Sequence, residues 1–368
     1  MTDQHYMRQA LRFARKGLGY VNPNPMVGSV IVKDGVVVGA GYHRRFGQEH
    51  AEVMALRAAG EQAQGATLYV NLEPCCHYGK TPPCTNAIIA AGIKRVVVGM
   101  VDPNPLVNQK GIDILKAHHI EVISGVEEDA CKELNRVFIK YITTGMPYVT
   151  LKIAQTLDGR IASRTGHSQW ITSYPARVMA HRLRHAHDAV VVGIGTVLAD
   201  DPQLTVRHVK GRNPWRVVLD THLQIPLACQ LLNDPFVSKT IVATAAEKPE
   251  KIAQLQERGV TVWQLPLAEA GHLSLPHLLQ QLAAIRVSAV MVEGGGRLYT
   301  SFLNSKLVDH IIVAIAPKIL GAGIEAIGDL GIRQVDQSLQ LDRIRYQKLG
   351  PDFLISGDIR FDSTATGE

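Results

Sequence analysis

Short runs rich in Val, Ile and Leu alternate along the chain with stretches of helical periodicity, and this alternation restricts the fold more than any other feature. In the first half, the strand-like runs ATLYVNL (66–72) and RVVVGM (95–100) follow a helical pattern over about 50–60. The second half repeats the alternation, with buried-strand runs such as DAVVVGIG (188–195) and SAVMVEG (288–294). The sequence therefore predicts α/β architecture throughout.

Length and turn signals divide this architecture into domains. The chain has 368 residues, enough for two or three compact domains. An early β-hairpin is predicted around Asp34-Gly35, a dipeptide that tolerates positive φ. The segment TTGMPY (143–148) carries Gly and Pro with few strong element formers. We therefore predict two α/β domains in tandem, over 1–145 and 146–368.

Composition excludes several classes of protein. Hydrophobic residues make up 46% of the chain and charged residues 20%, which is typical of a folded globular protein. The longest apolar stretch, roughly 189–199, is about half the length of a membrane-spanning helix. The first 17 residues carry charges throughout and lack the apolar core of a signal peptide. We expect a cytoplasmic protein with no membrane partner.

The net charge of +6 raises the question of nucleic-acid binding. The excess of positive charge is divided evenly between the two halves, without a basic tail or an arginine-rich run. Such a balance suits small anionic substrates at least as well as a phosphate backbone. We therefore predict small-molecule substrates and no nucleic-acid partner.

Three of the five cysteines, Cys75, Cys76 and Cys84, lie within ten positions of one another. In a cytosolic chain such a cluster indicates metal binding or catalysis before a disulfide. His50 and Glu52 precede the cluster, at the expected start of a helix. One imidazole and two thiolates are the ligand set of a catalytic zinc, which keeps a fourth position for water and lowers the pKa of that water. We predict that His50, Cys75 and Cys84 bind Zn²⁺, and that Glu52 is a catalytic residue that moves a proton from water to a leaving amine.

Other interpretations of the cysteine cluster stay open on the sequence alone. A structural zinc needs four ligands, and Cys76 or His77 could be the fourth. The thiols could also be inert and buried, as we expect for Cys131 and Cys229. A histidine and a glutamate two positions apart can share a site only in the first turn of a helix. A structural site would leave that glutamate without a role.

The pattern H-x-E with P-C-x-x-C is the signature of zinc-dependent nucleobase deaminases. This chain matches it at His50-Ala51-Glu52 and Pro74-Cys75, but eight residues instead of two separate Cys75 from Cys84. The insert CHYGKTPPC, with NPNPMVGSVIV, HAE and VDPNPLV, resembles the deaminase half of the bifunctional riboflavin-biosynthesis deaminase/reductase family. The resemblance implies a cytidine-deaminase-like three-layer α/β fold and a diaminopyrimidinone ribosylamine phosphate as substrate. It assigns substrate contacts to Asn24, His43, His77, Lys80 and Asn104.

In the second half, a strand, a glycine-rich turn and a helix start follow one another in SAVMVEGGGRLYTSFLNS (288–305). Backbone amides at such a turn can bind an anion, because no Cβ blocks its approach. Another turn, Gly193-Ile194-Gly195, lacks the third glycine of the dinucleotide fingerprint and does not indicate a Rossmann domain. The strings LKIAQTLDGRIA, SQWIT, VGIGTVLADDPQLTVR, VEGGGRL and IAPKILG resemble the reductase half of the same family. The resemblance implies a dihydrofolate-reductase-like α/β domain that uses NADPH to reduce the ribosyl group to ribityl, and a homodimer or larger homo-oligomer.

The resemblance also assigns residues to the reductase site. NADPH contacts fall on Ala154, Trp170, Thr196, Asp200, Gly295, Gly296, Arg297, Leu298, Tyr299, Thr300 and Ser301. Substrate contacts fall on Ser168, Arg184, Leu204, Arg207 and Glu293, with Lys152 near the sugar. Guanidinium groups suit a sugar phosphate because they bind it bidentately. A lysine can hydrogen-bond the opened ribose, and a glutamate at the end of a strand can position substrate or relay a proton, so Lys152 and Glu293 are predicted catalytic residues.

Non-functional roles stay open for three of these residues, since Arg184 could be a surface residue, Asp200 part of a turn, and Trp170 a core residue.

Two other functions also stay open. A zinc deaminase could act on a nucleobase in RNA or DNA, with the second domain as a binding module. The positive charge and 15 histidines motivate that alternative, but no basic stretch is interleaved with aromatics. A zinc-stabilised regulatory protein would leave the HAE triplet and the glycine turn unexplained.

Overall fold

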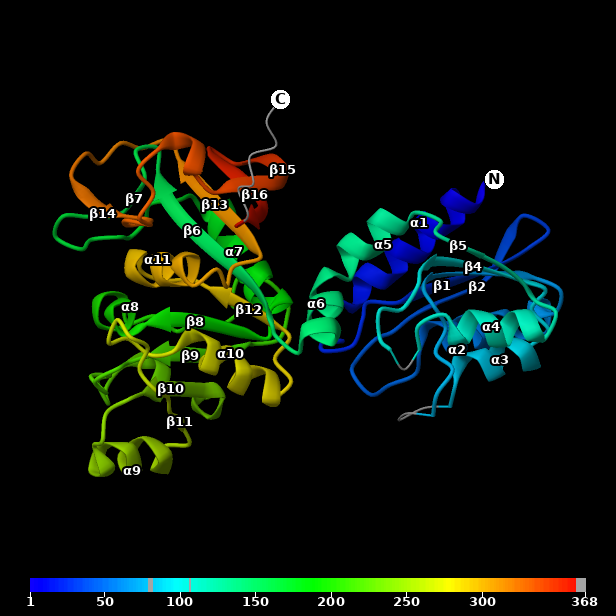
Figure 1. Ribbon diagram of the computed structural model, residues 1–368, viewed down its shortest axis with the longest axis horizontal. Helices are drawn as coiled ribbons and strands as arrows, with labels where there is room; N and C mark the ends of the chain where they lie inside the picture. Colours follow the sequence, from blue (N-terminus) through cyan, green and yellow to red (C-terminus); the bar gives the residue numbers. More distant parts are fainter. Residues whose placement is uncertain (79–81, 106, 362–368) are drawn as a thin grey trace. The chain divides into compact units, whose positions relative to one another are not determined.

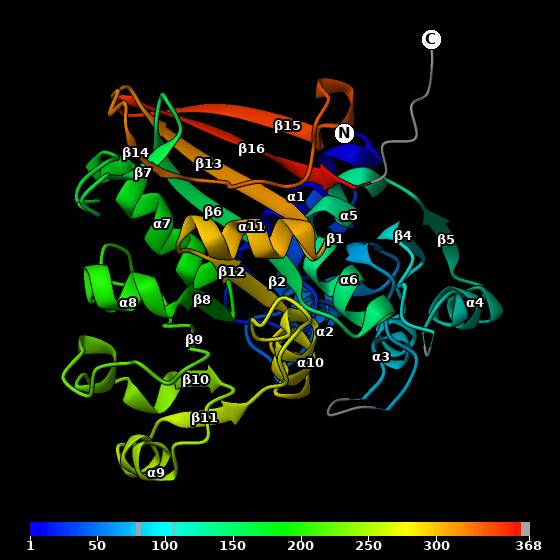
Figure 2. The ribbon, with the colours of Figure 1, turned by 60° about the vertical axis from the view of Figure 1, so that its left-hand side comes forward.

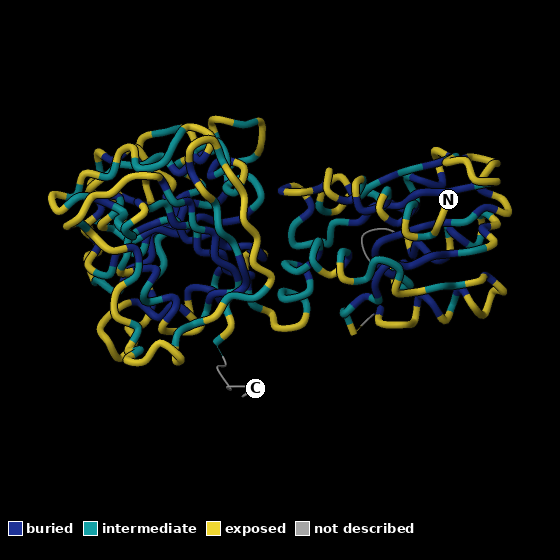
Figure 3. Tube along the Cα trace, turned by 90° about the horizontal axis from the view of Figure 1, so that it is seen from above, coloured by how far each residue is buried: buried dark blue, intermediate teal, exposed yellow. Residues whose placement is uncertain are grey.

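The computed structural model describes residues 1–78, 82–105 and 107–361 (Figure 1). The chain divides into two compact units, Met1–Met146 and Pro147–Glu368. In each unit buried backbone runs through the middle and exposed backbone lies outside (Figure 3). Among the described residues, no helix has the length and apolar character that crossing a membrane requires.

The first unit is a three-layer α/β domain, as predicted. Its described strands form one sheet in the order β2-β1-β3-β4-β5, with β2, β1 and β3 antiparallel and β3, β4 and β5 parallel. The strands are β1 (Gly28–Lys33), β2 (Val36–Tyr42), β3 (Thr67–Leu72), β4 (Arg95–Met100) and β5 (Glu121–Ser124). One face carries α1 (Asp3–Ala14) and α5 (Glu128–Leu134), and the other carries α2 (Ala51–Ala59), α3 (Cys84–Ala90) and α4 (Lys110–Ala117), as Figure 1 shows. The last helix of the unit is α6 (Arg136–Thr144).

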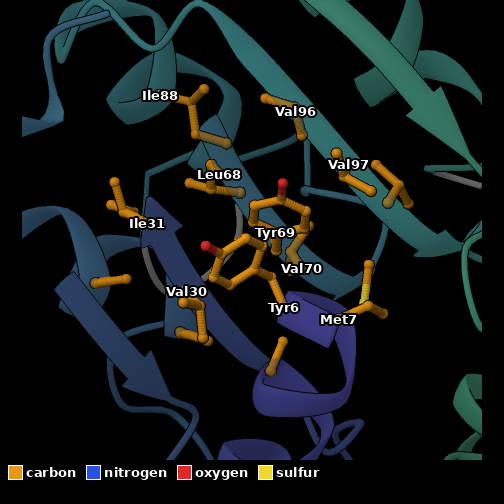
Figure 4. Close-up of a cluster of buried hydrophobic side chains, with 14 of the residues drawn as sticks. Tyr6, Met7, Val30, Ile31, Leu68, Tyr69, Val70, Ile88, Val96 and Val97 are labelled. Atoms are coloured by element: carbon orange, nitrogen blue, oxygen red, sulfur yellow. The ribbon is translucent and has the colours of Figure 1, made fainter. Parts of the chain in front are cut away.

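The apolar periodicity of the first helix explains how one face of this sheet is covered. The buried residues of α1 recur at the three- and four-residue spacings of a single helix face: Tyr6, Met7, Ala10, Leu11 and Ala14. The rings of Tyr6 and Tyr69 lie 5.1 Å apart between centroids, beside Val30 of β1 (Figure 4). This contact joins α1 to the central strands β1 and β3.

The second unit is built on one larger sheet in the order β11-β10-β9-β8-β12-β6-β13-β16-β15. Its strands are β6 (Tyr148–Thr156), β8 (Ala189–Gly193), β9 (Trp215–Leu219), β10 (Thr240–Thr244), β11 (Thr261–Gln264), β12 (Ala289–Val292), β13 (His310–Ala316), β15 (Gln340–Leu349) and β16 (Asp352–Arg360), with β7 (Arg160–Ser163) and β14 (Gly323–Glu325) paired separately. The described helices are α7 (Tyr174–Ala186), α8 (Ile194–Asp200), α9 (Pro249–Glu257), α10 (Leu275–Ala284) and α11 (Gly296–Asn304). Strands from β11 to β13 in the sheet order are mutually parallel, and β16 and β15 are antiparallel to their neighbours.

The parallel arrangement places the carboxyl ends of β6, β8 and β12 at one edge of the sheet. The helices α8 and α11 begin directly after β8 and close after β12, so their first turns lie at that same edge. In open α/β sheets ligands bind outside the carboxyl ends of the strands. The fold thus brings the two glycine turns of the sequence to one place.

The long hairpin of β15 and β16 was not predicted. It extends the sheet beyond β13 (Figure 2). Most of β15 is exposed, and its sequence QLDRIRYQKL mixes charged and apolar residues without alternating burial. A strand with little buried surface gives no clear period-2 signal, which is why the sequence did not reveal it.

Candidate functional site

The predicted metal ligands of the first unit converge from three separate segments. His50 immediately precedes α2, Cys84 is the first residue of α3, and Cys75 lies in the loop after β3. The His50 Nδ1 atom lies 3.1 Å from Cys84 Sγ and 3.4 Å from Cys75 Sγ, and all three ligand atoms lie within 4.8 Å of one another. Ligand bonds of about 2.0–2.3 Å separate the ligand atoms of a tetrahedral zinc by less than about 4 Å. The two distances from His50 fall within this limit, and the grouping of the three atoms fits one zinc ion.

The surroundings of Cys75 favour its thiolate form. The N–H of Cys84, at the start of α3, donates to Cys75 Sγ at 3.3 Å. Hydrogen bonds from Cys84 and His50 lower the pKa of Cys75 to about 4, although burial opposes them. Within the described part of the chain, Cys76 and His77 do not join the group of ligand atoms, so the four-ligand structural site is not supported. A catalytic zinc with a fourth position for water fits this donor set.

Glu52 lies beside the metal ligands in the first turn of α2, the one place where it can share a site with His50. Its side chain is buried, and its Oε2 atom has no hydrogen-bond partner among the described residues. Burial raises the pKa of Glu52. A buried carboxyl group with an unused oxygen beside a water-binding metal is suited to accept a proton and to pass it on.

A cavity of about 340 Å³ opens beside the metal ligands. Its lining includes four of the predicted substrate-binding residues, namely Asn24, His43, His77 and Asn104. The Nδ1 of His43 lies 3.0 Å from the carbonyl of Glu49 and must donate to it, so its Nε2 accepts from Asn24 Nδ2 at 3.1 Å. Burial lowers the pKa of His43, in keeping with this neutral form. The predicted contact Lys80 lies outside the described residues.

The sequence did not identify several residues that line this cavity. Glu73 and Asp102 contribute buried carboxyl groups, and Phe138 and Tyr141 contribute rings from α6. Burial raises the pKa of Asp102 to about 6, with Glu73 and Cys75 nearby. Glu73 stands two positions before a metal ligand and could have been singled out. The α6 rings lie on an amphipathic helix without a motif, so only the fold reveals them.

The second unit contains a cavity of about 1310 Å³ at the carboxyl ends of β6, β8 and β12. It is lined by nearly all the residues predicted for the second half: Lys152, Ala154, Ser168, Trp170, Arg184, Thr196, Asp200, Leu204, Arg207, Glu293, Gly295, Gly296, Arg297, Leu298, Tyr299 and Ser301. Thr300 is the exception. Its hydroxyl donates to the Gly296 carbonyl at 2.7 Å and accepts from the Gly328 N–H at 2.8 Å. Thr300 therefore secures the start of α11.

Three charged side chains meet inside this cavity. Arg184 donates from Nε and Nη2 to the two carboxylate oxygens of Glu293, at 2.9 and 2.6 Å, and from Nη1 to the Thr205 carbonyl at 3.0 Å. Burial alone would raise the pKa of Glu293, but Arg184 and then Lys152 lower it overall. Burial lowers the pKa of Lys152, opposed by Glu293. Arg184 is thus no surface residue, because Glu293 and the loop after α8 hold it.

Two further alternatives from the sequence are also resolved. Trp170 is 62% exposed, and the Arg177 guanidinium lies over its ring at 4.3 Å, so Trp170 is not a core residue. Asp200 ends α8 and accepts a hydrogen bond from Ser168 Oγ at 2.8 Å. Asp200 therefore connects two cavity-lining segments.

The cavity of the second unit also contains His181, which the sequence did not suggest as a functional residue. The ring is buried, lies 4.4 Å from that of His208, and accepts the Arg207 N–H on Nδ1 at 2.9 Å. Burial, Arg184 and His208 lower the pKa of His181 to about 4. The structure therefore requires the neutral ring.

We expect His181 to make the second unit less stable in acid. The unfolded chain protonates this histidine below about pH 6.5, whereas the folded chain does so only near pH 4. Between these values the unfolded state binds more protons, so the free energy of unfolding falls as the pH is lowered. Urea unfolding of wild type and His181→Asn, which keeps an acceptor but does not titrate, measures the effect. The wild type should lose more stability over this window than the variant, and the exposed His272→Asn should behave as wild type. Parallel profiles of wild type and His181→Asn would contradict the expectation.

Comparisons with known proteins match each unit to a known family. Residues 147–355 match the family model described as the RibD C-terminal domain, and residues 1–100 match the cytidine and deoxycytidylate deaminase zinc-binding region. The riboflavin biosynthesis protein RibD of Aquifex aeolicus is 51% identical over 354 residues, which cover 96% of this chain and 97% of that protein.

Solved structures of related proteins are similar to this chain over 97% of its length. One form of Acinetobacter baumannii RibD superposes with a TM-score of 0.88 at 41% identity, covering 97% of this chain and 99% of that one. A Thermotoga maritima structure, described as a diaminohydroxyphosphoribosylaminopyrimidine deaminase/5-amino-6-(5-phosphoribosylamino)uracil reductase, superposes with a TM-score of 0.83 at 37% identity and the same coverage. Both matches extend over the two units.

Proposed function

The chain belongs to the RibD family and is a bifunctional deaminase and reductase of riboflavin biosynthesis, and from this premise we propose which residues carry out each reaction. We assign deamination of the diaminopyrimidinone ribosylamine phosphate to the first unit and reduction of its ribosyl group to the second. The observation that carries the assignment is the convergence of most of each unit's predicted residues on one cavity. The alternative of a deaminase that acts on nucleic acid has no comparable support.

In the first unit, His50, Cys75 and Cys84 form the zinc site. The zinc ion, when bound, supplies the Lewis acid that activates water. Glu52 Oε2 accepts the proton that this water loses on adding to the amine-bearing ring carbon. Glu52 then returns the proton to the amino nitrogen, the carbon–nitrogen bond breaks, and ammonia leaves. Burial of Glu52 keeps bulk water from taking over this proton transfer.

The other lining residues of this cavity recognise the substrate in our proposal. The side-chain amides of Asn24 and Asn104 can pair with the amide-like edges of a pyrimidinone. His43 is neutral and holds Asn24 in place through their hydrogen bond. His77 and Lys80 are also predicted to contact the substrate, and a lysine can pair with its phosphate or with a ring oxygen.

In the second unit we propose NADPH as the nucleotide cofactor, with the first turn of α11 facing its phosphates. NADPH, when bound, supplies the hydride for the sugar carbon. Lys152 supplies the proton or positive charge that the opening sugar oxygen needs. Glu293, held by Arg184, positions the substrate, and Arg207 is available to a phosphate. The homo-oligomeric state and the cytoplasmic location stay predictions.

Zinc removal tests the first assignment. We expect about one zinc per chain, and we expect chelation to abolish deamination because water then lacks its activating metal. Elemental analysis and product assays measure both, with zinc addition as the reversal. The reductase activity on deaminated substrate should persist. Cys84→Ser should lose zinc, while Cys229→Ser, a buried thiol in the second unit, should keep it. Deamination by metal-free protein would exclude the zinc mechanism.

A further inference from the structure

Glu73 has a hydrogen-bond arrangement that the deaminase chemistry does not use. Its side chain is buried in the first unit, two positions before Cys75, and it lines the cavity. Its Oε2 accepts the backbone N–H groups of Asp102 at 3.1 Å and Gln109 at 3.0 Å. Its Oε1 accepts those of Gly111 at 3.0 Å and Ile112 at 3.3 Å. One carboxylate thus binds both ends of the loop after β4 and the first turn of α4.

These contacts exclude a catalytic role for Glu73. Each carboxylate oxygen offers two acceptor positions, and two N–H groups occupy each oxygen. Glu73 therefore has no acceptor left for a substrate or a proton in transit. The start of α4 also lies very close to the segment around Pro74. A Cβ atom added at Gly111 would lie only 2.1 Å from the Pro74 carbonyl oxygen, which is too close for any side chain. Gly111 lets the helix start lie directly against the segment that carries Cys75.

Asp102 links Glu73 to the residues that face the substrate cavity. Glu73 fixes the backbone of Asp102, and Asp102 Oδ1 accepts the N–H of Asn104 at 2.8 Å. Both Asp102 and Asn104 line the cavity, on the side formed by the loop after β4. Glu52 and the metal ligands come from other segments, α2, α3 and the loop after β3. The Glu73 contacts therefore secure residues that face the substrate without supplying a metal ligand.

We propose that Glu73 is a positioning residue that sets the affinity of the deaminase site for its pyrimidine substrate by holding Asp102 and Asn104 in place. This inference rests on the proposed assignment of deamination to the first unit. It predicts an effect on KM rather than on kcat, because proton transfer by Glu52 and the metal site are left intact once the substrate is bound.

The test is the steady-state kinetics of deamination by Glu73→Gln and Glu73→Asp. The Gln side chain replaces one acceptor oxygen by an NH₂ donor that faces two N–H groups, so about half of the contacts are lost. We expect KM to rise at least tenfold and kcat to change less than threefold, with zinc content and reductase activity as in wild type. Glu73→Asp keeps the charge and all acceptors on a shorter side chain. Its KM should therefore lie between that of wild type and that of Glu73→Gln. Amide exchange of the Asp102, Gln109 and Gly111 N–H groups should become faster in Glu73→Gln.

Glu128→Gln, which changes a half-exposed glutamate on α5 that pairs with Lys132, serves as the control and should have wild-type kinetics. A wild-type KM in Glu73→Gln would overturn the inference. A loss of zinc, or a fall in kcat at unchanged KM, would also overturn it, since Glu73 would then support the metal site and not the substrate. If Glu73→Gln does not fold, a wild-type KM in Glu73→Asp overturns the inference and a raised KM at unchanged kcat supports it. Failure of wild type itself to deaminate would reject the proposed function instead, which separates the two failures.

Discussion

Glu52→Gln is expected to lower the rate of deamination by about 10³-fold, within the range that general acid–base groups contribute. The substitution keeps the shape of the side chain and removes only its ability to accept and return a proton. Burial makes the loss larger, because Glu52 is only 3% exposed and bulk water cannot easily replace it as the proton acceptor. The metal ligands are separate side chains, so zinc should remain bound.

The measurement is the release of ammonia from substrate by protein of known zinc content. Reduction of already deaminated substrate should proceed at the wild-type rate, since the second unit has its own core and cavity. Glu61→Gln, an exposed position in the same unit, is the matched control. Wild-type deamination by zinc-loaded Glu52→Gln would exclude Glu52 as the proton carrier.

Lys152→Met is expected to slow the reduction by about 10²-fold and to leave deamination unchanged. A hydride that reaches the sugar carbon leaves an electron pair on the departing oxygen, which must be neutralised by a proton or a positive charge. Lys152 lines the cavity beside Glu293 and Arg184, and burial lowers its pKa, so its ammonium group gives up a proton more readily than a surface lysine. Methionine matches its length without the amine.

The loss of NADPH absorbance with deaminated substrate measures this effect. The wild-type rate should fall as the pH rises through the lowered pKa of Lys152, because only the protonated amine can donate. The exposed Lys306→Met in the same unit should match wild type. An unchanged rate in Lys152→Met would leave the proton donor in the second unit unassigned.

The sequence predicted those parts of the fold whose signals are local. The hairpin at Asp34-Gly35 and the start of α2 directly after His50 were both expected and both confirmed. The motif also predicted the metal ligands His50, Cys75 and Cys84, and the structure brings these three side chains together. In each case the signal, whether turn chemistry, apolar periodicity or motif spacing, involves residues that are close together in the sequence.

Contacts between distant segments could not be predicted in the same way. Nothing in the sequence indicates that Glu73 would accept N–H groups from residues 102–112, or that Arg184 would be held by Glu293 109 positions later. The rings of Phe138 and Tyr141 reach the cavity only because α6 packs beside it. Such partners depend on tertiary structure, which no local pattern encodes.

The central claim, two working sites in one chain, is tested most directly by mass spectrometry of the product. Zinc-loaded wild-type protein is incubated with the diaminopyrimidinone ribosylamine phosphate and NADPH. We predict a product in which an oxygen replaces the ring amino group and the ribosyl group is reduced to ribityl. Recovery of unchanged substrate from folded, zinc-containing protein would contradict the account.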